Sequence, residues 1–260
     1  MTDDPRQDGV VTTLRAAGCV FAEEEARLLL AEARTPGELN EMVGRRVAGL
    51  PLEQILGWAE FCGLRLVVEP GVFVPRRRTE LLVEQAVALA RTGATVVDLG
   101  CGTGAIGVAV AAGLGRVELH AVDIEPAAVR CARKNVDPVG GSVHEGDLFA
   151  PLPSALRGRV DLVVTCPPYV PTDHIRLMPP EARLHEPRTA LDGGADGLDL
   201  LRRIAEAAPG WLTPGGHLLA ETSAAQAPVA ADVLAGHGLA GRVVGDEERG
   251  ATVVIGTSAG

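Results

Sequence analysis

The chain has 260 residues, of which 47% are hydrophobic and 22% are charged, and its formal net charge is −10. This is enough apolar material for one large globular domain, or for an ordinary domain with a smaller one beside it. The negative charge argues against broad binding to nucleic acid, which needs a basic surface. No apolar run reaches the ~18 residues of a membrane span, and the acidic start of the chain is unlike a signal peptide. We therefore expect a cytoplasmic protein that contacts neither nucleic acid directly nor a membrane.

The cysteines and histidines show no metal-binding spacing. Neither a C-x-x-C nor an H-x-x-x-H pattern occurs, and the number of cysteines is odd. This favours reduced thiols in a reducing compartment, without disulfides and without a structural metal. The five cysteines are Cys19, Cys62, Cys101, Cys131 and Cys166.

Residues 1–57 are predicted to form a small helical domain. Residues 22–33 carry apolar side chains at helical spacing, with acids in the first turn. Thr35 is followed by Pro36 and, three positions on, by Glu38, which is the spacing of a capping box with proline at the first helical position. This segment contains no cluster typical of catalysis, so we expect a lobe that packs on the rest or recruits a substrate.

Residues 58–75 are predicted to form a β-hairpin linker. Residues 61–68 favour a strand, and the sequence Glu69-Pro70-Gly71 predicts a turn into a second strand over 72–74. A helix is expected from Thr79 to Ala90.

Residues 76–260 are predicted to form an α/β domain. Strands alternate with helices from Thr95 onward, which indicates a doubly wound, mostly parallel sheet of seven strands. The last two strands are joined by a short turn, so they should form an antiparallel hairpin at the sheet edge. The expected strands are 95–99, 117–122, 142–145, 160–165, 216–221, 240–244 and 251–256, and the expected helices are 104–113, 126–136, 197–208 and 224–237.

Three acidic residues follow three successive predicted strands. Asp98 precedes a loop with glycine at alternate positions, Asp123 ends the second strand, and Asp147 follows the third. Alternate glycines let a backbone turn sharply and approach a ligand, and the helix after the loop directs its first amides into the same space. At such positions an acid binds the ribose hydroxyls of a nucleotide. The pattern therefore predicts a nucleotide-like cofactor.

Two cofactors compete at this loop. Residues 102–107 match the dinucleotide fingerprint G-x-G-x-x-G, with Asp123 about twenty residues on, which favours an NAD(P)-dependent oxidoreductase. Asp98 argues for the other candidate, because a carboxylate suits a cationic amino-acid group and would repel a pyrophosphate. S-adenosylmethionine carries an ammonium, a sulfonium, a ribose and an adenine, and no phosphate.

The fourth strand ends in the sequence Cys166-Pro167-Pro168-Tyr169. Two prolines cannot donate hydrogen bonds to a sheet, and each fixes its own φ angle. The loop is therefore stiff and leaves backbone carbonyls unpaired beside an aromatic ring. In open α/β sheets ligands bind at the carboxyl ends of the strands, so we interpret this loop as the place where an acceptor is held.

Together these motifs resemble class I S-adenosylmethionine methyltransferases, and most closely the HemK/PrmC family, which methylates a glutamine of peptide-chain release factors. Further likeness lies in the stretches 51–57, 60–61, 73–84, 186–191 and 215–221, so the resemblance covers roughly residue 50 to the end. It implies that the cofactor S-adenosylmethionine binds Asp98, Gly100, Cys101, Gly102, Thr103, Gly104, Asp123, Ile124, Asp147, Leu148 and Cys166. It implies that the catalytic and acceptor-binding loop is Cys166, Pro167, Pro168 and Tyr169, with Arg76 and Glu186 also contacting the substrate.

The chain departs from this family at one position. The family has Asn before the two prolines, and its side-chain carbonyl binds the target amide; Cys166 is only a weak acceptor. Three interpretations stay open: backbone carbonyls suffice for glutamine, the acceptor is a smaller metabolite or a more nucleophilic amine or hydroxyl, or Cys166 acts as a thiol. A cofactor-binding protein without activity is a further alternative.

The segment 170–199 is long and rich in Pro, Gly and charge. Loops of this length without secondary structure are usually lids or disordered linkers. Its position after Tyr169 favours a lid, in which Glu186 or His185 faces the acceptor.

Overall fold

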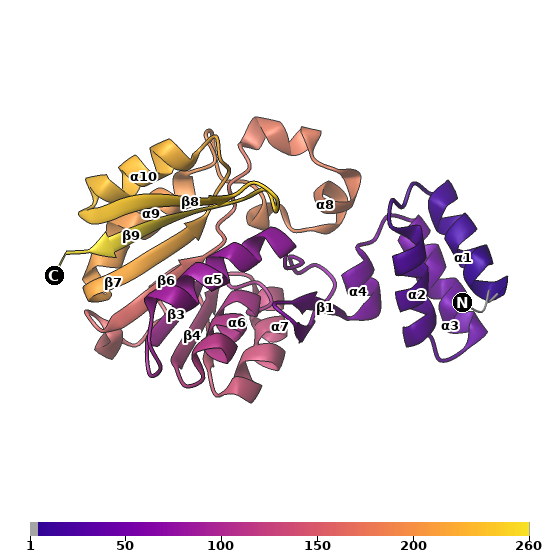
Figure 1. Ribbon diagram of the computed structural model, residues 1–260, viewed down its shortest axis with the longest axis horizontal. Helices are drawn as coiled ribbons and strands as arrows, with labels where there is room; N and C mark the ends of the chain where they lie inside the picture. Colours follow the sequence, from indigo (N-terminus) through magenta and orange to yellow (C-terminus); the bar gives the residue numbers. More distant parts are fainter. Residues whose placement is uncertain (1–4, 260) are drawn as a thin grey trace.

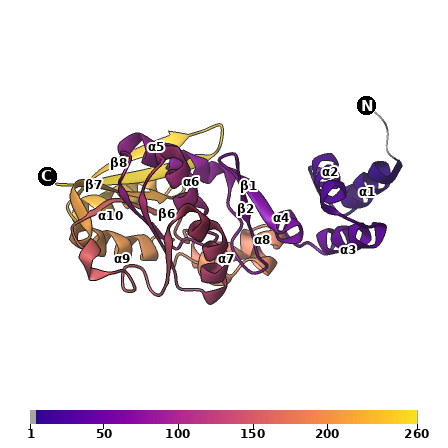
Figure 2. The same cartoon turned by 90° about the horizontal axis from the view of Figure 1, so that it is seen from below.

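The computed structural model describes residues 5–259, and in both views a helical lobe lies at one end of a larger α/β domain (Figures 1 and 2). The lobe comprises α1 (Pro5–Ala16), α2 (Ala22–Glu32), α3 (Pro36–Val47) and α4 (Leu52–Leu56). Its core is built from side chains such as Leu14, Ala26 and Leu29. Thr35 caps α3 as predicted, because its Oγ1 accepts a hydrogen bond from the Glu38 amide at 3.1 Å.

A β-hairpin joins the lobe to the large domain, but it lies earlier in the chain than predicted. The predicted turn at residues 69–71 is present, with the Val72 amide donating to the Glu69 carbonyl at 3.2 Å, whereas the predicted second strand over 72–74 was wrong. The strands are β1 (Trp58–Phe61) and β2 (Leu64–Val67). The turn lies at Cys62 and Gly63, both with positive φ, of 49° and 71°, which is the geometry of tight hairpin turns. Pro70 has no N–H with which to donate a hydrogen bond between strands. Residues 72–74 have no regular secondary structure, and Val72 and Val74 are buried.

The large domain is a seven-stranded sheet in the order β5-β4-β3-β6-β7-β9-β8. All neighbouring pairs are parallel except those of β9, which runs antiparallel to both β7 and β8. The predicted fold class is therefore confirmed, including the antiparallel edge hairpin. The strands are β3 (Thr95–Leu99), β4 (Glu118–Asp123), β5 (Ser142–Glu145), β6 (Val160–Thr165), β7 (Leu212–Glu221), β8 (Leu239–Asp246) and β9 (Ala251–Ser258).

Helices cover both faces of this sheet. One apolar core lies between the sheet and α5, α6 and α7, and a second lies between the sheet and α9 and α10. The helices are α5 (Glu80–Leu89), α6 (Ala105–Leu114), α7 (Pro126–Val136), α8 (Pro180–His185), α9 (Asp199–Ala207) and α10 (Ala227–Gly236). Within residues 5–259, no helix has the length and apolar character needed to cross a membrane.

The segment between β6 and α9 is ordered into short helical turns rather than being a structureless loop. Two 3-10 turns, over Thr172–Leu177 and Arg188–Ala190, flank the six-residue helix α8. Figure 1 shows α8 on the side of the large domain that faces the helical lobe. Arg46 of α3 and Glu181 of α8 form an ion pair at 2.8 Å that connects the lobe to this segment.

One buried side chain ties the hairpin to the large domain. Asn135 of α7 accepts a hydrogen bond from the Val67 amide at 2.8 Å and donates to the Val67 carbonyl at 3.0 Å. It also donates to the Thr103 carbonyl at 2.9 Å, within the glycine-rich loop. The Asn135 amide therefore connects the hairpin, α7 and the glycine-rich loop.

We expect Asn135→Ala to lower the free energy of unfolding by about 2–4 kcal/mol, because the buried Thr103 carbonyl and the partly buried Val67 amide would lose this partner. Urea denaturation measures this change. The matched control is Asn40→Ala, since Asn40 is exposed on α3. An equal effect of the two substitutions would contradict the bridging role of Asn135.

Candidate active site

A cavity lies at the carboxyl ends of β3, β4, β5 and β6, where the chain leaves each strand. Its floor and walls come from the glycine-rich loop, the ends of the strands, the linker and the segment before α9. The lining residues are Phe61, Gly71, Val72, Phe73, Pro75, Arg76, Thr79, Gly100, Cys101, Gly102, Thr103, Ala105, Ile106, Val122, Asp123, Ile124, Glu125, Ala128, Gly146, Asp147, Leu148, Cys166, Pro168, Pro187, Thr189, Ala190 and Leu200.

The glycine-rich loop turns directly into α6. Gly104 adopts φ 77° at the start of the helix, and a Cβ there would lie 2.7 Å from the Val136 side chain. Only glycine combines this conformation with this contact. The loop is thereby pressed against α7, and the first turn of α6 borders the cavity.

Asp98 lies beneath the loop with no exposed surface. Its Oδ2 accepts a hydrogen bond from the Gly107 amide at 2.9 Å, and its Oδ1 has no partner within residues 5–259. Burial raises the pKa of Asp98 to about 7, and the nearby Asp123 carboxylate adds to the rise. The site therefore contains a buried acid with one free oxygen and without a cationic partner.

Asp123 reaches the cavity from the end of β4. Its two oxygens accept backbone hydrogen bonds from Gly102 at 2.8 Å and from Glu125 at 2.9 Å. Each oxygen keeps a lone pair for a ligand. Burial raises the pKa of this carboxyl as well.

Asp147 and Leu148 form the rim beyond β5. Asp147 is half exposed and forms an ion pair with Arg203 at 2.5 Å. Leu148 adopts φ 48°, an unusual conformation for a branched residue, and its side chain lines the cavity. The apolar side chain is thus the part of this pair best placed to contact a planar ring.

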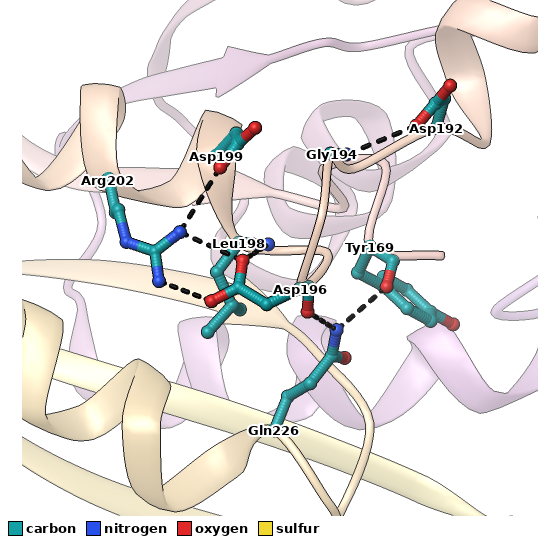
Figure 3. Close-up of polar contacts among 8 residues, drawn as sticks. All are labelled: Tyr169, Asp192, Gly194, Asp196, Leu198, Asp199, Arg202 and Gln226. Carbon is teal, nitrogen blue, oxygen red and sulfur yellow. Dashed lines mark hydrogen bonds and ion pairs between the residues drawn. The ribbon is translucent and has the colours of Figure 1, made fainter. Parts of the chain in front are cut away.

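The clamp, residues 166–169, is fixed from both sides of Tyr169. The Tyr169 hydroxyl donates to Glu221 Oε1 at 3.0 Å, and Arg78 Nε donates to the same oxygen at 3.0 Å. Figure 3 shows the other side, where the amide of Gln226 donates to the Tyr169 carbonyl at 2.9 Å and to the Asp196 carbonyl at 2.8 Å. Burial strongly raises the pKa of the Tyr169 hydroxyl, so it stays protonated and acts as a donor.

Cys166 lines the cavity beside Glu221. Thr165 is opposite Ala220 in the parallel pairing of β6 and β7, so Cys166 and Glu221 come next on the two neighbouring strands. Glu221 Oε2 is buried without a hydrogen-bond partner within residues 5–259. Burial raises the pKa of the Cys166 thiol well above its ordinary value, and Glu221 adds to this. A protonated thiol is a poor nucleophile, which argues against the thiol interpretation.

The segment before α9 closes one side of the cavity through two polar contacts. Thr189 Oγ1 donates to Glu125 Oε1 at 3.0 Å, across the cavity mouth. Glu186 Oε1 accepts from Arg76 at 2.5 Å and from the Val74 amide at 3.4 Å. Glu186 is therefore buried behind Arg76, and the segment is held against the linker.

Most of the residues predicted for this site line one cavity. Those that line it are Arg76, Gly100, Cys101, Gly102, Thr103, Asp123, Ile124, Asp147, Leu148, Cys166 and Pro168. Those that do not line it are Asp98, Gly104, Pro167, Tyr169, Glu186 and His185; apart from Asp98 and His185, each contacts a residue that does or lies next to one in sequence. Sequence reasoning did not assign Phe61, Val72 and Phe73, although their apolar run in the linker was visible.

Asp98 gives a pH prediction. Because its pKa is raised to about 7 in the folded chain, the folded state binds more protons than the unfolded state between about pH 4 and pH 7. Ionisation of Asp98 therefore costs stability as the pH rises through this window. We expect Asp98→Asn to be more stable than the wild type at pH 8, with a difference that shrinks towards pH 4.

Thermal unfolding at a series of pH values measures this difference. The matched control is Asp232→Asn, an exposed acid on α10. A pH-independent difference for Asp98→Asn would contradict the buried, unpaired carboxylate.

Comparisons with known proteins agree with this geometry. Residues 63–195 match the family described as the methyltransferase small domain. A crystal structure of a methyltransferase from Pyrococcus furiosus has the same fold, with a TM-score of 0.58 at 15% identity, over 76% of this chain and 90% of that one.

Among named relatives, the release factor glutamine methyltransferase of Geobacter sulfurreducens is 46% identical over 72% of this chain and 65% of its own length, just under two thirds. The protein of the same name from Cereibacter sphaeroides is 39% identical over 88% of both chains. A 4-amino-L-phenylalanine/4-methylamino-L-phenylalanine methyltransferase from Streptomyces pristinaespiralis is 38% identical over 77% of this chain and 75% of its own. With its motifs, cavity and fold in agreement, the chain belongs to the methyltransferase small domain family and, within it, to the group that contains the release factor glutamine methyltransferases.

Proposed function

We propose that the protein transfers a methyl group from S-adenosylmethionine to the side-chain amide of a glutamine in a protein such as a peptide-chain release factor. The observation that carries this proposal is the position of the clamp, whose Cys166 and Pro168 border the same cavity as Gly102 and Asp123. The names of relatives at up to 46% identity support the same acceptor.

The residues of the cavity fit this cofactor. Asp123 retains lone pairs for the ribose hydroxyls, and Leu148 offers an apolar contact for the adenine. The free oxygen of Asp98 supplies negative charge under the loop, which favours a cationic amino-acid group over a phosphate.

A dinucleotide fits less well. Within residues 5–259, Arg76 is the only arginine or lysine that lines the cavity, and it is already paired with Glu186. A pyrophosphate would therefore meet carboxylates without a free cation. This favours methyl transfer over the oxidoreductase considered from the sequence.

The protein contributes to the reaction by orienting the acceptor amide towards the methyl group of the cofactor and by shielding both from water. When bound, the cofactor supplies an electrophilic methyl group on a sulfonium. An amide nitrogen is a weak nucleophile, so its N–H groups must be fixed by acceptors while its lone pair faces the methyl group. The backbone carbonyl of Pro167 accepts no backbone hydrogen bond within residues 5–259, so it is the acceptor that we assign to the target amide. The hydrogen bonds of Tyr169 hold the loop that carries it.

A second candidate is an amine of a small metabolite. Cys166 removes the side-chain carbonyl that the family uses on an amide, and one relative is named for 4-amino-L-phenylalanine. Phe61 and Phe73 line the cavity and offer apolar contacts to an aromatic acceptor. An amine nitrogen is a stronger nucleophile than an amide nitrogen, so it depends less on hydrogen-bond acceptors that fix its N–H groups.

Incubation with labelled S-adenosylmethionine and a purified release factor tests the proposed function. We expect one methyl group on the glutamine of the Gly-Gly-Gln motif, located by peptide mass spectrometry. Labelling of 4-aminophenylalanine and not of the release factor would establish the second candidate instead. Cofactor binding without transfer to either would indicate a protein without this activity.

The substitution Cys166→Asn separates the two acceptors. An amide at position 166 lies next to Glu221, whose buried Oε2 has no partner, so its NH2 group can donate there and leave its carbonyl for the target amide. We expect methylation of the release factor to rise by at least about tenfold, which corresponds to about 1.4 kcal/mol. The measurement is kcat/KM with the intact release factor.

Cys166→Val is the control, because valine fills similar space without a carbonyl. A comparable gain from valine would rule out the hydrogen-bond explanation. If neither variant gains activity on the release factor, glutamine is the wrong acceptor.

A further inference from the structure

A second hollow lies on the outer side of the segment between the clamp and α9. It is separate from the cofactor cavity and is formed within residues 172–191. Three of its six lining residues are arginines, which is unusual in a chain whose net charge is −10. The lining residues are Thr172, Ile175, Arg176, Arg183, Arg188 and Leu191.

Two of the four acids in residues 172–192 are engaged outside this segment. Glu181 binds Arg46 of the helical lobe at 2.8 Å, and Glu186 binds Arg76 of the linker at 2.5 Å. Asp192 pairs with this cluster through Arg188 at 3.1 Å. Asp173, three residues before Arg176, is a second acid of the segment, and its carboxylate makes no hydrogen bond or ion pair within residues 5–259. The positive charge of the hollow is therefore only partly balanced by its own segment.

Two of the arginines are free to bind an anion. Arg183 makes no side-chain hydrogen bond or ion pair within residues 5–259, and Arg176 makes one, to the carbonyl of Asp173 at 3.1 Å. Both side chains are exposed. Their neighbours Leu177 and Leu184 are 69% and 68% exposed. Arginine is enriched at protein interfaces, and exposed apolar side chains beside polar ones mark surfaces that a partner covers.

The hollow and the cofactor cavity share one short stretch of chain. Arg188 and Leu191 line the hollow, whereas Pro187, Thr189 and Ala190 line the cavity. This stretch is held in place by the contact of Thr189 with Glu125 and by the pair of Glu186 with Arg76. A macromolecule seated on the hollow is thus next to the entrance of the methylation site.

We propose that this arginine-lined hollow docks an acidic segment of the protein acceptor while the target side chain enters the cavity. The proposal rests on the proposed function and specifies which surface of the protein acceptor is recognised. A protein partner fits better than nucleic acid, because the hollow offers only three cations on an acidic protein and has no aromatic side chain for stacking. Charge complementarity of this kind acts mainly on encounter and orientation.

The test compares the double variant Arg176→Glu/Arg183→Glu with wild type on two acceptors, an intact release factor and a short peptide that contains Gly-Gly-Gln. We expect KM for the intact release factor to rise by about tenfold at low salt, with kcat within about twofold of wild type. KM for the peptide should stay unchanged, because a short peptide does not reach the hollow. Added salt should raise the wild-type KM for the release factor and narrow the difference.

The matched control is Arg116→Glu/Arg159→Glu. These two exposed arginines precede β4 and β6, at the amino ends of strands whose carboxyl ends border the cavity, and the double variant makes the same change in net charge. An unchanged KM for the release factor in Arg176→Glu/Arg183→Glu, or an equal rise in the control, would overturn the proposal. Methylation of neither acceptor by the wild type would instead overturn the proposed function, and the docking proposal with it.

Discussion

The proline pair that ends β6 is the constraint on which the site depends. Without N–H groups, Pro167 and Pro168 cannot continue the sheet, so the chain must turn at the edge where the cofactor cavity opens. The loop must also be fixed in position to orient an acceptor. Tyr169 fixes it, because its hydroxyl donates to Glu221 and its carbonyl accepts a hydrogen bond from Gln226, the second of which Figure 3 shows.

The same network couples the clamp to the segment that follows it. Gln226 also binds the Asp196 carbonyl, and Arg202 pairs with the Asp196 side chain at 2.5 Å. A Cβ on Gly193 would lie 2.5 Å from the Pro168 carbonyl, so the two stretches of backbone are in direct contact. The clamp, the segment between it and α9, and the start of α10 are therefore connected by hydrogen bonds. A substrate docked on that segment, as we propose, would be oriented with respect to the clamp.

Much of this site was predictable from the sequence, because its signals are local. Alternate glycines after a buried strand, and acids at strand ends, report backbone geometry that neighbouring residues determine; α7 was predicted with its observed bounds, 126–136. The hairpin was misplaced because Glu69-Pro70-Gly71 is a strong turn signal and does form a turn, whereas Cys62, at the hairpin's own turn, is a rare residue at positive φ. Arg76 and Arg78, which pair with Glu186 and Glu221, lie more than 100 residues away from them in sequence, and no local pattern reveals such contacts.

Cys166 is where family and chain differ, and Glu221 gives this difference a structural meaning. A buried carboxylate oxygen without a donor is costly, and here it lies beside the position where the family carries an amide. Either the acceptor itself donates a hydrogen bond to Glu221 Oε2, or the site binds its substrate more weakly than the family does. Both alternatives arise from Cys166 in place of Asn, while the rest of the clamp is as in the family.

The central claim is that cofactor and acceptor bind in the same cavity. The most direct test is a crystal structure with S-adenosylhomocysteine and a peptide that contains Gly-Gly-Gln. We expect the ribose hydroxyls on Asp123 and the glutamine nitrogen within hydrogen-bond distance of the Pro167 carbonyl. A nucleoside bound away from Asp123, or a glutamine that does not reach the clamp, would contradict a methylation site formed by these two elements together.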